Sequence, residues 1–388
     1  MTAVAPLRRD ALGAVARAGM FVFGIVIALF GAVMPVLLDR LSLGLADVGL
    51  VFLVTNGAML GASVIVGPAM DRVGMKAPLV LGALLVASAL VAIAYVPTLR
   101  ALLAAAAALG FGGGMLNAGT NTLVADLYDD PAAKASALNI LGAFYGVGAL
   151  LLPASVGALL SLVGLVPLMG TAAALCAVTA AATAALAFPV PKQARGVPLA
   201  QVRRFLGAPL VALLAGLLFF ESGNEFLLGG YFSTCATGVL GMPVERASYL
   251  LAGYWAAITL ARLVLSRIVL LAGTYPVLLG GAVVASAGAI AVAMAHDGTL
   301  ATIGILVTGL ALAGIFPTVL GLAAAAFPNH SGTVFGILFT AALTGGMTLP
   351  WLAGHLAAAA GLRAVFVMAA GSFLAVAGFI AIARRVAG

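Results

Sequence analysis

The sequence predicts an all-α membrane protein with twelve transmembrane helices in two pseudo-symmetric six-helix bundles. Three observations lead to this fold class. Hydrophobic residues make up 64% of the 388 residues and charged residues only 7%, which is too apolar for the surface of a soluble globular domain. The apolar residues fall into runs of membrane-spanning length. Lys and Arg gather at alternate ends of these runs.

Hydropathy divides the chain into twelve runs of about 20 residues or more, the length that a bilayer core requires. We expect helices at approximately 15–38, 48–70, 77–97, 100–126, 134–161, 165–189, 206–234, 244–270, 274–295, 298–327, 331–358 and 362–383. The longest runs are compatible with tilted helices. No small-residue cleavage site follows the first run, so we interpret it as a retained helix.

The basic residues predict the orientation of these helices. With both termini in the cytoplasm, 14 of the 18 Lys and Arg residues lie inside, and only Arg40, Arg100, Arg246 and Arg363 lie outside. This asymmetry favours a multi-pass protein of the plasma (inner) membrane with both termini cytoplasmic. It also accounts for the net charge of +7, so we expect the lipid bilayer and no nucleic acid as a partner.

The chain also divides into two similar halves. We expect an N-terminal six-helix bundle at 1–189, a basic cytoplasmic linker at 190–205 and a C-terminal bundle at 206–388. A shift of 197 residues superposes five residues without a gap: Gly112 on Gly309, Leu123 on Leu320, Gly148 on Gly345, Pro153 on Pro350 and Gly157 on Gly354. A parallel repeat of six plus six helices is the layout of a secondary transporter whose site lies between its halves.

The loop between the second and third expected helices carries a specific motif. Residues 67–76 read Gly-Pro-Ala-Met-Asp-Arg-Val-Gly-Met-Lys, which matches the G-x3-D-R-x-G-x-K signature of the major facilitator superfamily. The resemblance implies that Asp71, Arg72, Gly74 and Lys76 belong to a gating loop that latches the outward-facing state. A plain positively charged loop on the inner side is the alternative interpretation.

Within that superfamily, several stretches resemble the fucose–galactose–glucose:proton symporter family. These stretches lie at 112–122, 138–153, 220–231, 314–318 and 350–354. Fucose transporters of the family carry one carboxylate in the first helix and another in the fourth, where this chain has Asn117. Because residues 31–34 hold no acid either, the resemblance does not supply a proton pathway through the N-terminal half.

Two carboxylates stand inside the seventh apolar run, at Glu221 and Glu225. A carboxylate in hydrocarbon costs several kcal/mol unless it faces water, finds a partner or holds a proton. Spacing of four residues places both on one helix face, roughly 6 Å apart, so they cannot both ionise cheaply. We predict that they carry proton coupling, beside a helix break at Gly229 and Gly230. Hydrated residues of an outer vestibule are the alternative.

A solute site requires a few polar groups on an apolar, aromatic wall. The candidates for substrate binding are Asn117, Asn121, Asn224, Tyr145, Tyr231, Tyr254, Trp255 and Trp351. For each Asn, helix–helix hydrogen bonding is a serious rival role, and the two Trp residues are equally compatible with interfacial anchoring. Arg262, in the cytoplasmic third of its helix, is predicted to act as a structural gate.

These features predict a carrier that works by alternating access through a cavity formed by spans one, four, seven and ten. Proton-coupled symport of a hexose-like sugar is the leading function, and proton-coupled efflux of a drug-like or amphipathic compound is the alternative. No nucleophile elbow, metal-ligand cluster or phosphate loop occurs in the sequence, so we expect no enzyme activity. We expect a monomer with no cofactor, with a proton or sodium as coupling ion.

Overall fold

The computed structural model describes residues 6–128, 130–188, 199–327 and 330–387. These residues form helices and no strand. The helices are α1 (Pro6–Leu41), α2 (Leu45–Val73), α3 (Lys76–Tyr95), α4 (Leu99–Leu127), α5 (Pro131–Val163), α6 (Leu165–Ala185), α7 (Leu199–Leu206), α8 (Pro209–Gly238), α9 (Val244–Ala272), α10 (Thr274–Met294), α11 (Gly298–Leu312), α12 (Ile315–Ala326), α13 (Ser331–Ala360) and α14 (Arg363–Ala387). Twelve stretches of helix in this part of the chain are long and apolar enough to cross a membrane. The predicted fold class is confirmed.

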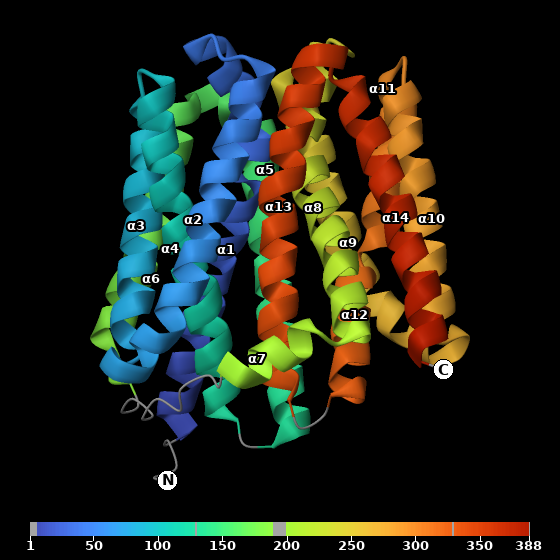
Figure 1. Ribbon diagram of the computed structural model, residues 1–388. Helices are drawn as coiled ribbons and strands as arrows, with labels where there is room; N and C mark the ends of the chain where they lie inside the picture. The colour runs from blue at the N-terminus through green and yellow to red at the C-terminus, as the bar shows by residue number, and fades with distance from the viewer. Residues whose placement is uncertain (1–5, 129, 189–198, 328–329, 388) are drawn as a thin grey trace. The chain divides into compact units, whose positions relative to one another are not determined.

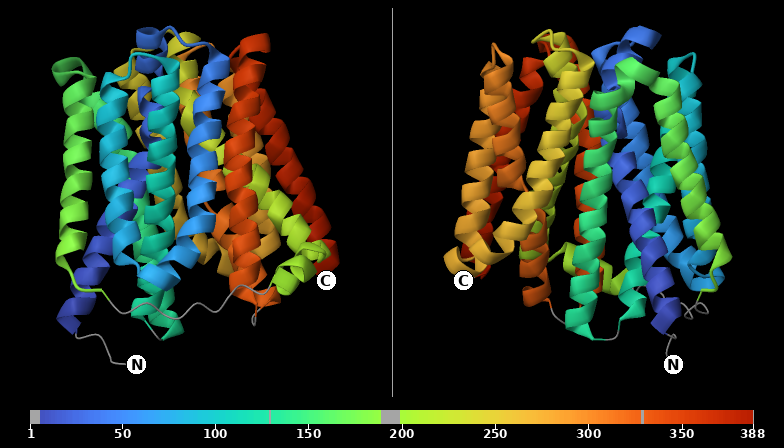
Figure 2. Two further views of the ribbon diagram at one scale, coloured as in Figure 1. Left: turned by 60° about the vertical axis from the view of Figure 1, so that its left-hand side comes forward. Right: turned by 180° about the vertical axis from the view of Figure 1, so that it is seen from behind.

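The chain forms two compact units, which we describe separately. Unit 1 comprises Met1–Val33 and Val54–Arg195, and unit 2 comprises Met34–Leu53 and Gly196–Gly388. In unit 1, α3 packs against both α4 and α6. In unit 2, α8 packs against α13 and α14, and α10 packs against α11 and α14 (Figure 1 and Figure 2). Residues 190–198 of the expected linker lie outside the described residues.

Residues 34–53, from the end of α1 and the start of α2, belong to unit 2 because their closest contacts are there. The Phe52 ring lies 5.9 Å from the Tyr231 ring, and a Cβ on Gly49 would lie 2.8 Å from the Trp351 carbonyl oxygen. The six-plus-six sequence pattern does not predict this grouping. A repeat pattern reports which helices are similar, whereas these contacts depend on which helix ends meet.

Glycines bring equivalent helices together in the two units. A Cβ on Gly148 of α5 would collide with the Phe21 carbonyl oxygen of α1, and a Cβ on Gly345 of α13 would collide with the Phe219 carbonyl oxygen of α8. In both units the first helix and the fifth span therefore approach to backbone contact. The superposition of Gly148 on Gly345 has a structural basis.

The superposition of Gly112 on Gly309 does not survive the same comparison. Gly309 of α11 packs on the Tyr254 carbonyl oxygen of α9, whereas Gly112 of α4 packs on Gly82 of α3. The residue of α4 that contacts the second span is Gly110, which lies against the Thr55 carbonyl oxygen. The equivalence of these spans requires a shift of 199 residues, because the two repeats differ by a small insertion.

The helix break predicted at Gly229 and Gly230 is wrong. The helix α8 continues through both residues to Gly238. Their missing side chains accommodate aromatic rings, since a Cβ on Gly229 would lie 2.9 Å from the Trp255 ring, and one on Gly230 would collide with the ring of Phe52. The break instead falls in the tenth span, between the end of α11 at Leu312 and the start of α12 at Ile315.

Candidate functional site

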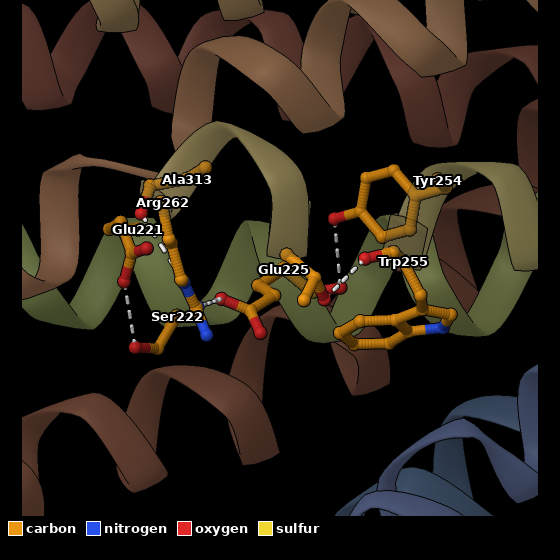
Figure 3. Close-up of polar contacts among 8 residues, drawn as sticks. Glu221, Ser222, Glu225, Tyr254, Trp255, Arg262 and Ala313 are labelled. Carbon is orange, nitrogen blue, oxygen red and sulfur yellow. Dashed lines mark hydrogen bonds and ion pairs between the residues drawn. The ribbon is translucent and has the colours of Figure 1, made fainter. Parts of the chain in front are cut away.

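The side chain of Arg262 connects three segments of unit 2 (Figure 3). Its Nη2 atom lies 3.6 Å from Oε2 of Glu225 on α8, and its Nε–H donates to the carbonyl oxygen of Ala313 at 3.4 Å. The Arg262 side chain is 29% exposed and that of Glu225 is 11% exposed. The pair is therefore screened from solvent more than a surface salt bridge but is not sealed from it.

The Ala313 carbonyl is available to Arg262 because of the sequence of the tenth span. In a continuous helix this carbonyl would accept from the amide of residue 317, four positions later. Residue 317 is proline and has no N–H. The guanidinium supplies a donor at the break, so Arg262 stabilises the junction between α11 and α12 while it pairs with the carboxylate of α8.

Glu221 lies one turn before Glu225 on α8 and is completely buried. Its Oε2 atom accepts a hydrogen bond from Ser222 Oγ at 2.9 Å, whereas its Oε1 atom has no hydrogen-bond partner among the described residues. An ionised carboxylate with one neutral donor is poorly compensated at such a position. The two acids predicted as one pair thus occupy different environments, one beside a cation and one beside a hydroxyl.

Tyr254 and Trp255 of α9 complete the wall beside Glu225. The hydroxyl of Tyr254 lies 3.5 Å from the Glu225 carbonyl oxygen, and the Tyr254 and Trp255 rings meet edge to face with centroids 5.3 Å apart. Both side chains are almost fully buried. They fix α9 on α8 at the level of the acid, which favours a positioning role over direct contact with a solute.

Two predicted substrate ligands are engaged in helix packing. Asn224 is buried, and its Oδ1 atom lies 2.6 Å from the Oγ atom of Ser372 on α14. The hydroxyl of Tyr231, also buried, donates to the carbonyl oxygen of Pro350 on α13 at 2.9 Å. Their positions favour the rival role of helix–helix bonding, so unit 2 offers fewer polar groups to a solute than the sequence suggested.

In unit 1 the amides of α4 face one another. Asn121 Nδ2 donates to the Oδ1 atom of Asn117 at 3.0 Å and to its carbonyl oxygen at 2.8 Å, and both side chains are half-buried. Tyr145 of α5 packs its ring against Phe23, with centroids 5.6 Å apart. Asn117 and Asn121 thus form a small polar patch on one face of α4, as their spacing predicted.

The remaining predicted residues lie at helix ends or on α13. Gly74 ends α2 with φ 84°, a conformation that favours glycine, and its amide donates to the Met70 carbonyl oxygen at 2.9 Å. Arg72 is exposed and Lys76 begins α3, while the side chain of Asp71 lies outside the described residues. Trp351 is half-buried, and its ring contacts His355 with centroids 4.8 Å apart.

Sequence reasoning missed the acceptor at Ala313 and the hydroxyls of Ser222 and Ser372. The first was detectable, because Gly314 and Pro317 stand together inside an apolar run and proline removes a helical hydrogen bond. The serines carried no such signal. A lone serine inside a transmembrane helix commonly bonds to its own helix, as Ser372 also does to the Met368 carbonyl oxygen.

Comparison with known proteins identifies the family. A family model described as Major Facilitator Superfamily matches residues 18–220, just over half of the chain. The chain belongs to the major facilitator superfamily. It is a multi-pass membrane transporter and not an enzyme. A comparison with curated proteins gives no match.

Solved structures of several transporters of this superfamily share the fold. A mutant of the nucleoside transporter NupG has a TM-score of 0.79 at 16% identity, covering 97% of this chain and 99% of that one. A bacterial homolog of the human lysosomal transporter Spinster, inward-facing and unoccupied, has a TM-score of 0.78 at 17% identity, covering 98% of each chain. A D-xylose–proton symporter has a TM-score of 0.76 at 15% identity, covering 94% and 97%. Such identities establish the fold and not the substrate.

Proposed function

We propose that this major facilitator protein is a proton-coupled symporter of a small neutral solute of the hexose class, with coupling on Glu225 and Glu221. The observation that carries the proposal is the contact between Glu225 and Arg262, 3.6 Å apart in the middle of α8. Unit 2 contains this carboxylate–guanidinium pair within a membrane-spanning region, where an unpaired charge is costly. The neighbours include a nucleoside transporter and a D-xylose–proton symporter, which is consistent with a hydroxylated solute.

Proton binding has a direct structural consequence at this pair. A proton on Glu225 removes the charge that holds Arg262 and leaves the guanidinium with its contact to Ala313. Because that contact lies at the junction of α11 and α12, the charge on α8 is linked to the one break within the described spans of unit 2. Protonation would thus weaken a connection between helices that must move during alternating access.

Glu221 has a complementary role in this proposal. Its buried Oε1 atom lacks a partner and lies one helical turn from Glu225. A proton held on Glu221 would remove the cost of an uncompensated buried carboxylate. Glu221 then serves as the inner proton acceptor and Glu225 as the residue that exchanges its proton for Arg262.

The rest of the proposal follows the sequence predictions. Asn117 and Asn121 would pair solute hydroxyls in unit 1, and the loop with Asp71, Arg72, Gly74 and Lys76 would act as a gate. The two units would correspond broadly to the expected bundles 1–189 and 206–388. The transporter would work as a monomer in the plasma membrane with both termini cytoplasmic, without a cofactor. Membership of the fucose–galactose–glucose:proton symporter family belongs to this proposal.

Transport by the purified protein in liposomes tests the proposal. A panel of labelled hexoses is offered with an imposed proton or sodium gradient, and gradient-driven uptake and equilibrium exchange are measured separately. We expect Glu225→Gln to abolish proton-driven uptake while sugar exchange continues. The matched control is Glu245→Gln, because Glu245 is the remaining glutamate of the chain and lies in the first turn of α9. It should behave as the wild type.

Two results would contradict the proposal. Unchanged proton-driven uptake in Glu225→Gln would remove coupling from this carboxylate, and uptake driven by sodium alone would replace the proton as coupling ion. The absence of both uptake and exchange for every sugar would remove the substrate class.

Efflux of an amphipathic compound by proton exchange is the second candidate function. It is favoured by one observation, namely that Asn224 and Tyr231 are engaged in helix packing and leave few polar groups for a sugar. In the same liposomes, with the protein oriented for export, extrusion of lipophilic dyes under a proton gradient and silence toward sugars would select this function.

A further inference from the structure

We propose that unit 2 binds an anionic phospholipid in a groove between the start of α10 and the end of α14. The groove has a volume of about 550 Å³ and is lined by Tyr275, Pro276, Leu279, Ile380, Ala381, Arg384 and Arg385. The two helices pack against each other, and the C-terminus in Figure 1 lies beside the start of α10. This inference is independent of the transported solute.

The groove combines the two surfaces that a phospholipid requires. Its upper wall is apolar, and the same helix faces continue with exposed aliphatic side chains, among them Leu279 at 41% and Ile382 at 51% exposure. Such surfaces suit acyl chains. Its end carries Arg384 and Arg385 in the last turn of α14, both exposed. Guanidinium groups at this position suit a phosphate.

Neither arginine is committed elsewhere in the part of the chain that the structure describes. The ion pair of that region is between Arg262 and Glu225, and no acidic side chain lines the groove. The first turn of α10 lacks a side-chain cap, because its N-cap residue is Gly273. Its amides add a favourable field for a negative group, in support of the arginines.

The position along the helices selects a lipid over a free anion. Arg384 and Arg385 lie on the side that the distribution of basic residues predicts to be cytoplasmic, where anionic lipids are concentrated. A soluble phosphate would gain nothing from the apolar wall formed by Leu279 and Ala381. A lipid with a charged headgroup would use both parts of the groove.

Native mass spectrometry of the detergent-purified full chain measures the affinity of the first bound phosphatidylglycerol. We expect the double substitution Arg384→Gln and Arg385→Gln to weaken this binding on the order of tenfold, since each basic residue near a membrane surface contributes a comparable amount. Phosphatidylcholine should bind weakly to wild type and variant alike. Inorganic phosphate should not displace the lipid.

The chain offers a matched control at Arg203 and Arg204. These arginines are also adjacent, exposed and in the last turn of a helix, α7, but they do not line the groove. Their double substitution to Gln should leave the affinity unchanged. Ala381→Phe fills the groove without changing any charge and should weaken binding as the arginine variant does. Thermal melting curves report whether each variant is folded.

Three outcomes would overturn the proposal. Equal losses in the Arg203/Arg204 and Arg384/Arg385 variants would indicate general charge attraction, and unchanged binding in folded Ala381→Phe would place the lipid elsewhere. Displacement by inorganic phosphate at concentrations that leave the detergent micelle intact would indicate a simple anion site.

Discussion

The two units share a scaffold but differ in the chemistry placed on it. The contact of Gly148 with Phe21 in unit 1 corresponds to that of Gly345 with Phe219 in unit 2, and it relates α1 to α8 by an offset of 198 residues. By this offset Phe23 occupies the position of Glu221 and Ile27 that of Glu225. The close helix contacts are retained where the polar residues are not.

The second and fourth spans show the same division. The contacts of Gly110 with Thr55 and of Gly309 with Tyr254 give an offset of 199 residues. Ser63 then corresponds to Arg262 and Ala118 to Pro317. The helix α4 is continuous through Ala118, whereas its counterpart divides into α11 and α12. The acids, the arginine and the break occur together in unit 2, so these features depend on one another and not on the scaffold.

The largest expected effect comes from transferring the proline. Ala118→Pro in α4 removes an amide and clashes with the preceding turn, which should destabilise the protein by about 3 kcal/mol or more. Pro317→Ala should not destabilise, because it supplies the missing donor to the Ala313 carbonyl and extends the helix. Thermal melts in detergent measure both changes. Hydrogen exchange across 313–318 should slow in Pro317→Ala, and unchanged exchange would contradict the account of the break.

Removal of the arginine should have the next largest effect. Arg262→Gln leaves the Glu225 carboxylate without its cation and should cost up to about 3 kcal/mol, the lower part of the range for buried pairs, since the Arg262 side chain is 29% exposed. The further change Glu225→Gln should restore much of that loss. Ser63→Ala, at the corresponding place in unit 1, should change stability by less than about 0.5 kcal/mol. Additive losses in the double variant would show that the two residues do not interact.

The shared scaffold predicts matched effects in the two units. Gly148→Ala and Gly345→Ala each place a methyl group against a backbone carbonyl and should destabilise by about 1–3 kcal/mol. Gly142→Ala and Gly336→Ala, on the same two helices, meet no atom within 4 Å and should be neutral or slightly stabilising. Melting temperatures of the four variants measure this. A loss at Gly148 without one at Gly345 would break the correspondence.

The sequence was sufficient for the spans because their hydrophobicity is a local property, and the bounds of α9, α10 and the α11–α12 span begin within a residue of the predicted ones. It was not sufficient for the break, since Gly229 and Gly230 were interpreted from their backbone freedom alone. Whether a glycine bends a helix or receives a ring depends on its neighbours, here Trp255 and Phe52. The partner of Glu225 was hidden for the same reason, because Arg262 reaches it from another helix.

The smallest expected effect distinguishes the caps at the start of the fourth and tenth spans. Thr98 caps α4 by accepting from the Ala101 amide, and Asp297, at an offset of 199 residues, caps α11 by accepting from the amides of Thr299 and Leu300. The hydrogen bonds from Leu300 and Thr299 hold the pKa of the Asp297 carboxyl below its ordinary value of 3.8.

A folded-state pKa below the unfolded one gives stability that is complete above pH 3.8 and is lost as the pH falls from there through the folded value. The Thr98 cap has no titratable group and keeps its contribution over this range. Melting temperatures of the wild type should therefore fall slightly more than those of Asp297→Asn as the pH decreases below 3.8, since Asn accepts the same bonds without a charge. Thr98→Ala should lower both curves in parallel, because the loss of a neutral cap does not depend on protonation. An identical pH profile for Asp297→Asn and the wild type would show that the carboxylate charge adds nothing to the cap of the tenth span.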